Sequence, residues 1–128
     1  INMIVEGIVA FCDLTETERY NGQDTGKYSL VITMEDDEAQ ALKESGVIVR
    51  EYKNKAQRKF VTKYPDFPVL DVEDNIVSKH IPYGSKVKIL WAEGNPHPTY
   101  GVATYIKKIK VLEYAEMSSG SSEDEEDF

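Results

Sequence analysis

Short segments with the alternating pattern of β-strands recur along this chain, separated by turns that contain glycine, asparagine or proline. Residues 3–13 and 27–34 are rich in β-branched and aromatic side chains, and similar patterns follow at residues 47–53, 59–64, 69–72, 86–92 and 100–114. Residues 36–45 differ, because strong helix formers follow two acids and precede a glycine, which predicts a short helix. Five or so strands and one helix in about 115 residues predict a small closed or half-closed barrel, since closure removes exposed sheet edges.

Glycines and prolines refine this prediction at particular positions. Gly7 predicts a bulge or a close backbone approach within the first strand. Residues 54–58 are expected to form a basic connection between two strands. Residues 93–98, which contain two prolines, are expected to form a loop that cannot pair. The hydrophobic period slips at Lys107 and Lys108, so we expect an interruption of the last strand there.

The size and the cysteine content limit the class of protein. A chain of 128 residues and 14.5 kDa is the size of a single domain. Cys12 is the single cysteine, which excludes an intramolecular disulfide framework and a cysteine-based zinc site and favours a reducing compartment. No apolar run approaches the ~20 residues of a membrane span. We therefore expect a soluble intracellular protein.

The net charge of −8 is unevenly distributed. Residues 116–128 hold six of the 23 acids and none of the 15 bases, so residues 1–115 carry 15 bases against 17 acids. Within residues 50–63 six bases face one acid, and the same holds for residues 79–110. This distribution predicts either a basic surface for a polyanion with an acidic tail that competes for it, or solvated charged faces with a solubilising tail.

Basic and aromatic residues interleave in the two basic stretches. Single-stranded nucleic acid needs both kinds, because cations track its phosphates and aromatic rings stack on its unpaired bases. The candidate DNA-binding residues are Arg50, Tyr52, Lys53, Lys55, Arg58, Lys59, Lys63, Tyr64, Lys86, Lys88, Trp91, Tyr100, Tyr105 and Lys107. Trp91 shares a strand face with Val87 and Ile89, which favours a place in the core, and Tyr64, Tyr100 and Tyr105 could serve either as stacking platforms or as packing residues.

Catalytic and metal-binding patterns are weak. Residues 35–38 are four successive acids that a helix N-terminus explains more simply than a metal site does. Asp66, Asp71, Glu73 and Asp74 could hold the two metals of a nuclease, but turn formation explains them more simply. His80 and His97 each stand without a second ligand. We therefore expect no enzyme activity, no metal and no cofactor.

A set of motifs in a fixed order resembles the single-stranded-DNA-binding proteins of podovirus-type bacteriophages, a divergent OB-fold family. The motifs are the strand at residues 29–34 followed directly by the helix, the segment P-V-L-D-V-E-D-N from Pro68, the segment Y-G-S-K-V-K-I from Tyr83, the strand ending V-L-E-Y, and an acidic tail that ends in D-F. The resemblance implies a mainly β, five-stranded Greek-key OB barrel in residues 1–115, with a flexible linker and tail in residues 116–128.

The resemblance also implies a function. It predicts sequence-independent binding of single-stranded DNA in phage replication, recombination and strand annealing, in the cytoplasm of an infected bacterial host. The tail would contact the replicative polymerase and helicase-primase and compete with DNA, through Glu123, Asp124, Glu125, Glu126, Asp127 and Phe128. A homodimer is a further possibility under this resemblance. The alternatives are an OB module that binds only proteins and a small metal-dependent nuclease.

Overall fold

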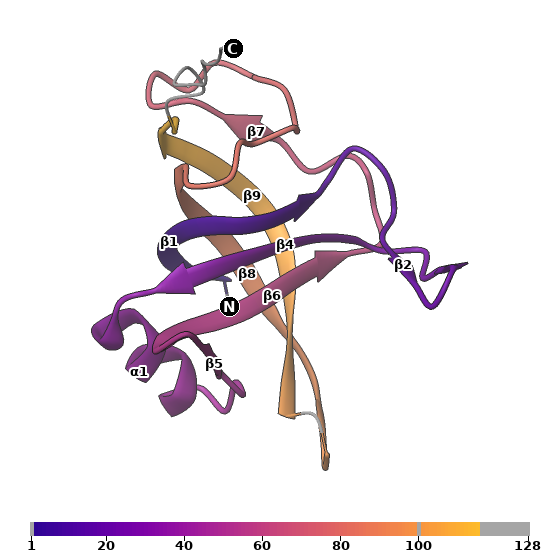
Figure 1. Ribbon diagram of the computed structural model, residues 1–128, viewed down its shortest axis with the longest axis vertical. Coiled ribbons are helices and arrows are strands. Elements are labelled where there is room, and N and C mark those ends of the chain that lie inside the picture. The colour runs from indigo at the N-terminus through magenta and orange to yellow at the C-terminus, as the bar shows by residue number, and fades with distance from the viewer. Residues whose placement is uncertain (1, 100, 116–128) are drawn as a thin grey trace, which may run out of the picture.

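Five long strands of this chain close into a barrel (Figure 1). The computed structural model describes residues 2–99 and 101–115. The barrel strands are β1 (Asn2–Asp13), β4 (Tyr28–Met34), β6 (Lys55–Thr62), β8 (Lys86–His97) and β9 (Gly101–Glu113). The shorter elements are β2 (Arg19–Tyr20), β3 (Gln23–Asp24), helix α1 (Asp36–Glu44), β5 (Arg50–Tyr52) and β7 (Val69–Leu70).

The barrel closes where β6 meets β9. The long strands lie in the order β6, β4, β1, β8, β9 with antiparallel neighbours, and a parallel pairing of Val61 with Tyr105 joins the two ends. This is the topology of an OB fold, so the predicted fold class is confirmed. The β2–β3 hairpin projects from one side of the barrel, and the far ends of β8 and β9 extend beyond it (Figure 1).

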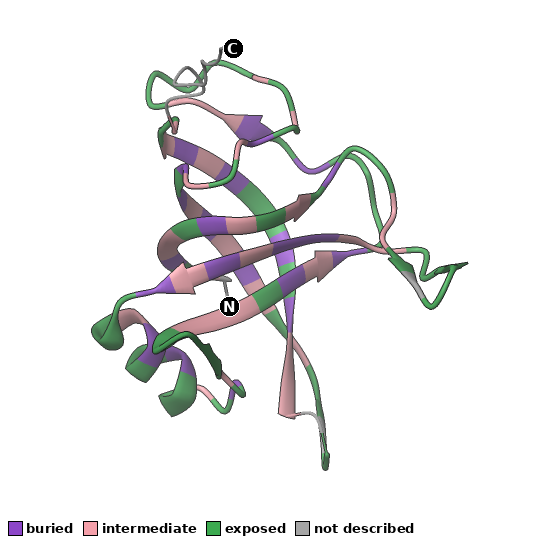
Figure 2. Cartoon of the chain, viewed as in Figure 1, coloured by how far each residue is buried: buried purple, intermediate pink, exposed green. Residues whose placement is uncertain are grey.

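The core follows the alternation of the strands. Side chains at alternate positions point inward and are buried, which appears as alternating colour along the ribbons in Figure 2. Phe60 and Trp91 pack edge to face in the interior with their ring centroids 5.8 Å apart. The prediction that Trp91 shares the core face of its strand with Val87 and Ile89 is confirmed, because these three side chains are at most 1% exposed.

Gly7 and a bulge shape the first strand. A Cβ at Gly7 would lie 2.6 Å from the carbonyl oxygen of Thr33, so the predicted close backbone approach is confirmed. The pairing of β1 with β4 shifts register between Val9 and Phe11. Val5 and Val9 point into the core, and the extra residue of the bulge reverses the alternation, so that Phe11 points outward and is 66% exposed.

Two expectations for the connections are wrong. Residues 55–58, expected in a connection, belong to β6, which pairs with β5 through a two-residue turn. Lys53 and Asn54 form this turn with φ angles of 52° and 66°, a conformation that asparagine tolerates well and that matches the twist of a hairpin. The strands expected at residues 47–53 and 59–64 are accordingly the two arms of a tight hairpin, whose bounds are Arg50–Tyr52 and Lys55–Thr62.

The region at residues 93–98 also pairs, contrary to expectation. β8 continues to His97, and Pro96 lies opposite Val102 after a register shift. Proline is tolerated because it follows a bulge in a part of the hairpin that extends beyond the barrel. The period slip at Lys107 is a bulge as well, because Leu90 lies opposite Lys108 while Trp91 lies opposite Ile106; β9 itself is not interrupted.

The predicted helix is confirmed as α1. Three acids occupy its first turn, Lys43 lies in its last turn, and Gly46 follows with a φ of 87°. This arrangement satisfies the helix dipole and ends the helix with a glycine. Within residues 2–99 and 101–115, no helix is long and apolar enough to cross a membrane.

Two phenylalanines test this account of the core. Replacing Phe60, which is fully buried against Trp91, with alanine is expected to lower the free energy of unfolding by about 3–5 kcal/mol. Phe11→Ala removes the same atoms from an exposed position and should change it by less than about 0.5 kcal/mol. Urea denaturation followed by circular dichroism measures both. Equal losses would contradict the assignment of the two rings to opposite faces of the barrel.

Candidate nucleic-acid interface

A groove runs between the end of β6 and the middle of β9. It has a volume of about 530 Å³ and is lined by Thr62, Lys63, Tyr64, Asp66, Phe67, Pro68, Ala92, Glu93, Tyr105, Ile106 and Lys107. The parallel contact between β6 and β9 places its two halves together. Of the candidate residues, the groove contains two tyrosines and two lysines, from segments about 40 residues apart.

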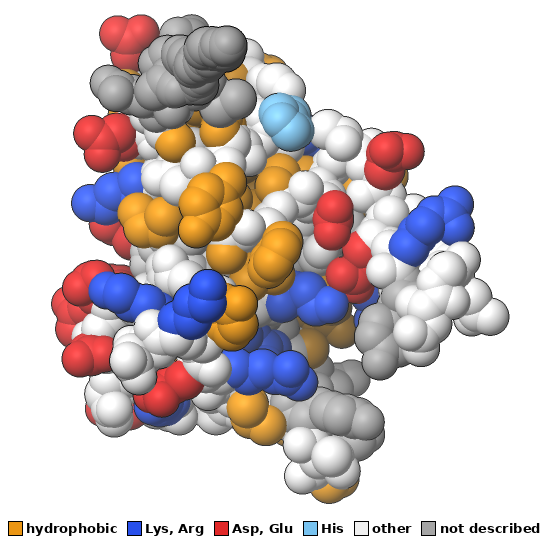
Figure 3. Space-filling view, in the orientation of Figure 1, with side chains coloured by type: hydrophobic (Ala, Val, Ile, Leu, Met, Phe, Trp, Pro, Cys, Tyr) orange, Lys and Arg blue, Asp and Glu red, His pale blue; other side chains and the backbone are white. Residues whose placement is uncertain are grey.

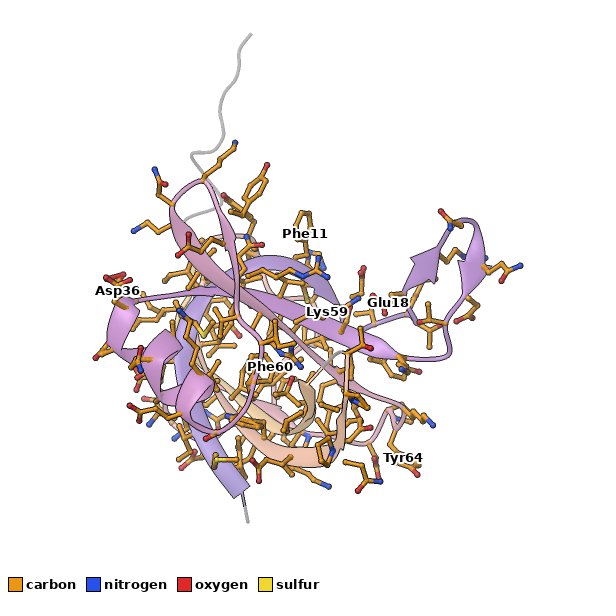
Figure 4. All side chains as sticks on the ribbon, turned by 90° about the horizontal axis from the view of Figure 1, so that it is seen from below. Phe11, Glu18, Asp36, Lys59, Phe60 and Tyr64 are labelled. Atoms are coloured by element: carbon orange, nitrogen blue, oxygen red, sulfur yellow. The ribbon has the colours of Figure 1, made fainter. Side chains whose placement is uncertain are left out.

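The two tyrosines of the groove are held differently. Tyr64 follows β6 and is 71% exposed, so its ring is accessible to a base; Figure 4 shows this residue at the edge of the molecule. Tyr105 is 38% exposed and rests against Gly94 of β8, where a Cβ would lie 2.4 Å from the tyrosine ring. Gly94 therefore leaves room for the Tyr105 ring, which also lines the groove.

Arg58 is occupied by the fold rather than free for a phosphate. Its guanidinium donates hydrogen bonds to Thr104 Oγ1, to the carbonyl oxygen of Ile48 and to that of Val102, at 3.0–3.1 Å. Burial lowers the pKa of Arg58, and the charge of Arg50 lowers it further. The side chain thus joins β6 to the start of β9 and to the segment before β5.

The remaining cations divide between different surfaces. The β5–β6 hairpin exposes three cations together with Tyr52, namely Arg50, Lys53 and Lys55. Lys53 Nζ lies 5.3 Å from the centroid of the Tyr52 ring. Lys55 and Lys86 share a second groove with four acids, Glu6, Glu35, Asp37 and Glu38. Lys88 lies on β8, opposite Glu6 of β1 and Lys110 of β9, and lines neither groove.

Two candidate aromatic residues do not belong to a described surface. Trp91 is 1% exposed and packs on Phe60, so its ring has no face available to a base, and its Nε1 has no hydrogen-bond partner among the described residues. Tyr100 and the tail residues Glu123 to Phe128 lie outside the described residues. We therefore remove Trp91 from the candidate interface.

Phe11 is an exposed aromatic residue that the sequence pattern missed. On the outer face of the barrel Phe11 lies opposite Val31, and Val31 lies opposite Lys59. Figure 4 shows Phe11 on the outside and Phe60 in the interior. Figure 3 shows hydrophobic side chains gathered on this face with lysine and arginine side chains below them. Simple alternation places Phe11 inward, so only the bulge, which has no sequence signature here, reveals it.

Two of the four carboxylates considered for a nuclease are engaged elsewhere, one in a turn and one in an ion pair. Asp71 accepts hydrogen bonds from the backbone N–H groups of Asn75 and Glu73, and these hold the pKa of its carboxyl below the ordinary value. Asp74 pairs with Lys110 at 2.9 Å. In the part of the chain that the structure describes, no group of three histidine, cysteine or acidic side chains could hold a metal ion.

Comparison with known proteins places this geometry among solved structures. No protein-family model matches the chain, and no curated protein sequence matches it. The single-stranded-DNA-binding protein of bacteriophage Enc34, solved in complex with single-stranded DNA, superposes with a TM-score of 0.68 at 14% identity, over 90% of this chain and 88% of that one. Gp2.5, a single-stranded-DNA-binding protein of bacteriophage T7, gives 0.65 at 13% identity, over 94% and 91%. This chain has the OB fold of these phage proteins.

The match extends over most of both chains, so it covers the barrel and its additions rather than the barrel alone. A C-terminally truncated form of the Enc34 protein gives a TM-score of 0.67 at 15% identity over 90% of this chain. The resemblance to phage single-stranded-DNA-binding proteins predicted from the sequence is confirmed by these structures.

The role assigned to Arg58 can be tested by a conservative change. Arg58→Lys keeps the charge but loses the fork of donors that reaches three acceptors, so we expect the free energy of unfolding to fall by about 1–3 kcal/mol. Arg50→Lys makes the same chemical change at an exposed site and should cost less than about 0.5 kcal/mol. Chemical denaturation compares the two variants. If Arg58→Lys proves as harmless as Arg50→Lys, Arg58 does not hold β6 to β9.

Proposed function

We propose that this chain binds single-stranded DNA without sequence preference, along the groove between β6 and β9. The observation that carries the proposal is the convergence of two exposed tyrosines and two lysines in one groove of an OB barrel. Tyrosine rings stack on any base, and lysines attract the phosphates on either side, so affinity does not require base-edge recognition. The fold shared with phage proteins that bind single-stranded DNA supports the same proposal.

The exposed β5–β6 hairpin supplies further cations to the proposed interface. Arg50, Lys53 and Lys55 lie on it beside Tyr52. Lys59 lies on the outer face of β6, where its side chain is 50% exposed and pairs with Glu18. With about five phosphates contacted, the logarithm of the binding constant should fall with the logarithm of salt concentration at a slope of about −3.5.

The proposal extends to a role in phage DNA replication, recombination and strand annealing in the host cell. Residues 1–115 would form the DNA-binding domain, and residues 116–128 would contact the replicative polymerase and helicase-primase through their acids and Phe128. Five acids directly before Phe128 support this part, because a plain solubilising segment needs no aromatic residue.

The groove tyrosines give the direct test. Tyr64→Ala and Tyr105→Ala should each weaken binding of a fluorescein-labelled oligothymidine by about 5- to 150-fold, since a stacked base contributes about 1–3 kcal/mol. Fluorescence anisotropy measures this affinity, and it is preferable to tryptophan quenching because Trp91 is buried.

Tyr83→Ala is the matched control, because Tyr83 is 78% exposed and does not line the groove. Its affinity should equal that of the wild type, and duplex DNA should bind less tightly than the single strand. Absence of single-strand binding by the wild type would refute the proposal and leave a protein-binding OB module. Cleavage of the strand on addition of magnesium would instead indicate a nuclease.

Deletion of residues 123–128 tests the tail. If the acids compete with DNA for the basic surface, the shortened chain should bind oligothymidine at least about threefold more tightly at low salt, and the difference should shrink as salt rises. A variant that keeps the acids and replaces only Phe128 with alanine serves as the control and should bind DNA like the wild type. Unchanged or weaker binding after deletion would show that the tail does not compete.

A further inference from the structure

The carboxylate of Glu18 lies on the outer face of the barrel and accepts hydrogen bonds from two strands. Ser29 Oγ of β4 donates to Glu18 Oε2 at 3.2 Å, and Lys59 Nζ of β6 lies 3.1 and 3.3 Å from the two carboxylate oxygens. The Glu18 side chain is 15% exposed, against 50% for that of Lys59. Figure 4 shows Glu18 and Lys59 next to each other on this face. The exposed Lys59 is thus neutralised from within the chain.

The two donors are fixed by the barrel. Ser29 lies opposite Val61 and Lys59 opposite Val31, so the donors occupy diagonal positions on one face of the β4–β6 pair. A hydroxyl and an ammonium group on rigid strands form a donor set for any anionic oxygen, and phosphate oxygens accept from the same groups in protein–DNA contacts.

The acceptor, Glu18, lies in a loop. Backbone hydrogen bonds close the base of this loop, and they do not involve the Glu18 carboxylate. The backbone N–H of Glu18 donates to the carbonyl oxygen of Lys27 at 2.8 Å, and its own carbonyl oxygen accepts from the Thr25 N–H at 3.0 Å. Leu14, which is 1% exposed, anchors the preceding end in the core. The carboxylate can therefore leave Ser29 and Lys59 while these backbone bonds keep the loop together.

The surroundings favour a nucleotide as the incoming ligand. The exposed ring of Phe11 lies in the same row across the sheet as Val31 and Lys59. Neighbouring strands are about 4.8 Å apart, so this row is about 10 Å long, the scale of one nucleotide. A phosphate on Lys59 would place its base near the Phe11 ring, and none of these three residues lines the groove of Tyr64 and Tyr105.

We propose that Ser29 and Lys59 form a subsite for a backbone phosphate of single-stranded DNA, and that Glu18 occupies this subsite in the free protein as a built-in competitor. The inference rests on the proposed function and adds to it both a position on the DNA path and a means of attenuating affinity. An ion pair that is partly exposed contributes little net free energy, so a strand already held by the groove can exchange its phosphate for the carboxylate.

The test compares Glu18→Gln with Glu16→Gln in anisotropy titrations with oligothymidine at low salt. Both variants remove one negative charge from the same loop, but Glu16 is exposed, and it is Glu18 that Ser29 and Lys59 contact. Glu18→Gln should raise the affinity about three- to tenfold above that of Glu16→Gln, because it removes the ion pair that holds residue 18 on Lys59 as well as reducing repulsion. Glu18→Asp keeps the charge but shortens the side chain, and should also raise the affinity.

A second background isolates the lysine. In a chain that carries Lys59→Gln, the advantage of Glu18→Gln over Glu16→Gln should disappear, since no ammonium remains to be released. Equal affinities of Glu18→Gln and Glu16→Gln, or an advantage that persists without Lys59, would overturn the inference while the proposed function stands. Failure of the wild type to bind would overturn the proposed function itself, and the inference with it.

Discussion

The parallel contact between β6 and β9 is the interaction on which the rest of the structure depends. Val61 lies opposite Tyr105, and Thr104 Oγ1 donates to the Lys59 carbonyl oxygen while accepting from Arg58. Without this contact both strands would present unpaired edges, and the barrel would open into a sheet. The same contact places Lys63 and Tyr64 beside Tyr105 and Lys107, so barrel closure and assembly of the groove are one event. The place where β6 and β9 close the barrel is therefore also the candidate binding surface.

The basic side chains of the barrel form separate local groups rather than one continuous surface. The bases that the sequence groups into two stretches separate in three dimensions into a groove with tyrosines, an exposed hairpin, and a second groove in which two lysines meet four acids. Arg58 is withdrawn into the fold, and Lys59 carries an internal counter-ion. A polyanion responds to the potential along its own path, so the net charge of the chain says little about whether such a path exists.

Several features of the fold were accessible from local patterns. The strands at residues 3–13 and 27–34, the helix after them and the core face of Trp91 follow from alternation and capping, and all three are found. The misassigned segments depend on a left-handed turn and on bulges. The β5–β6 turn has a left-handed backbone at Lys53 and Asn54, whereas the extension of β8 to His97 and the reversal at Phe11 follow bulges, which shift register by a residue. A shift of one residue exchanges inside and outside, so pattern reasoning fails at such points.

The sequence by itself determined which segments are strands, which side chains are candidates for DNA, and the resemblance to phage OB-fold proteins, because periodicity, residue type and motif order are local properties of the chain. Only the tertiary structure decided which candidates meet. It placed Tyr64 and Tyr105 in one groove and buried Trp91. It also bonded Arg58 to β9 and paired Glu18 with Lys59. The reason is that barrel closure and bulge positions set distances between residues far apart in the chain, and these depend on how every strand packs at once rather than on any one segment.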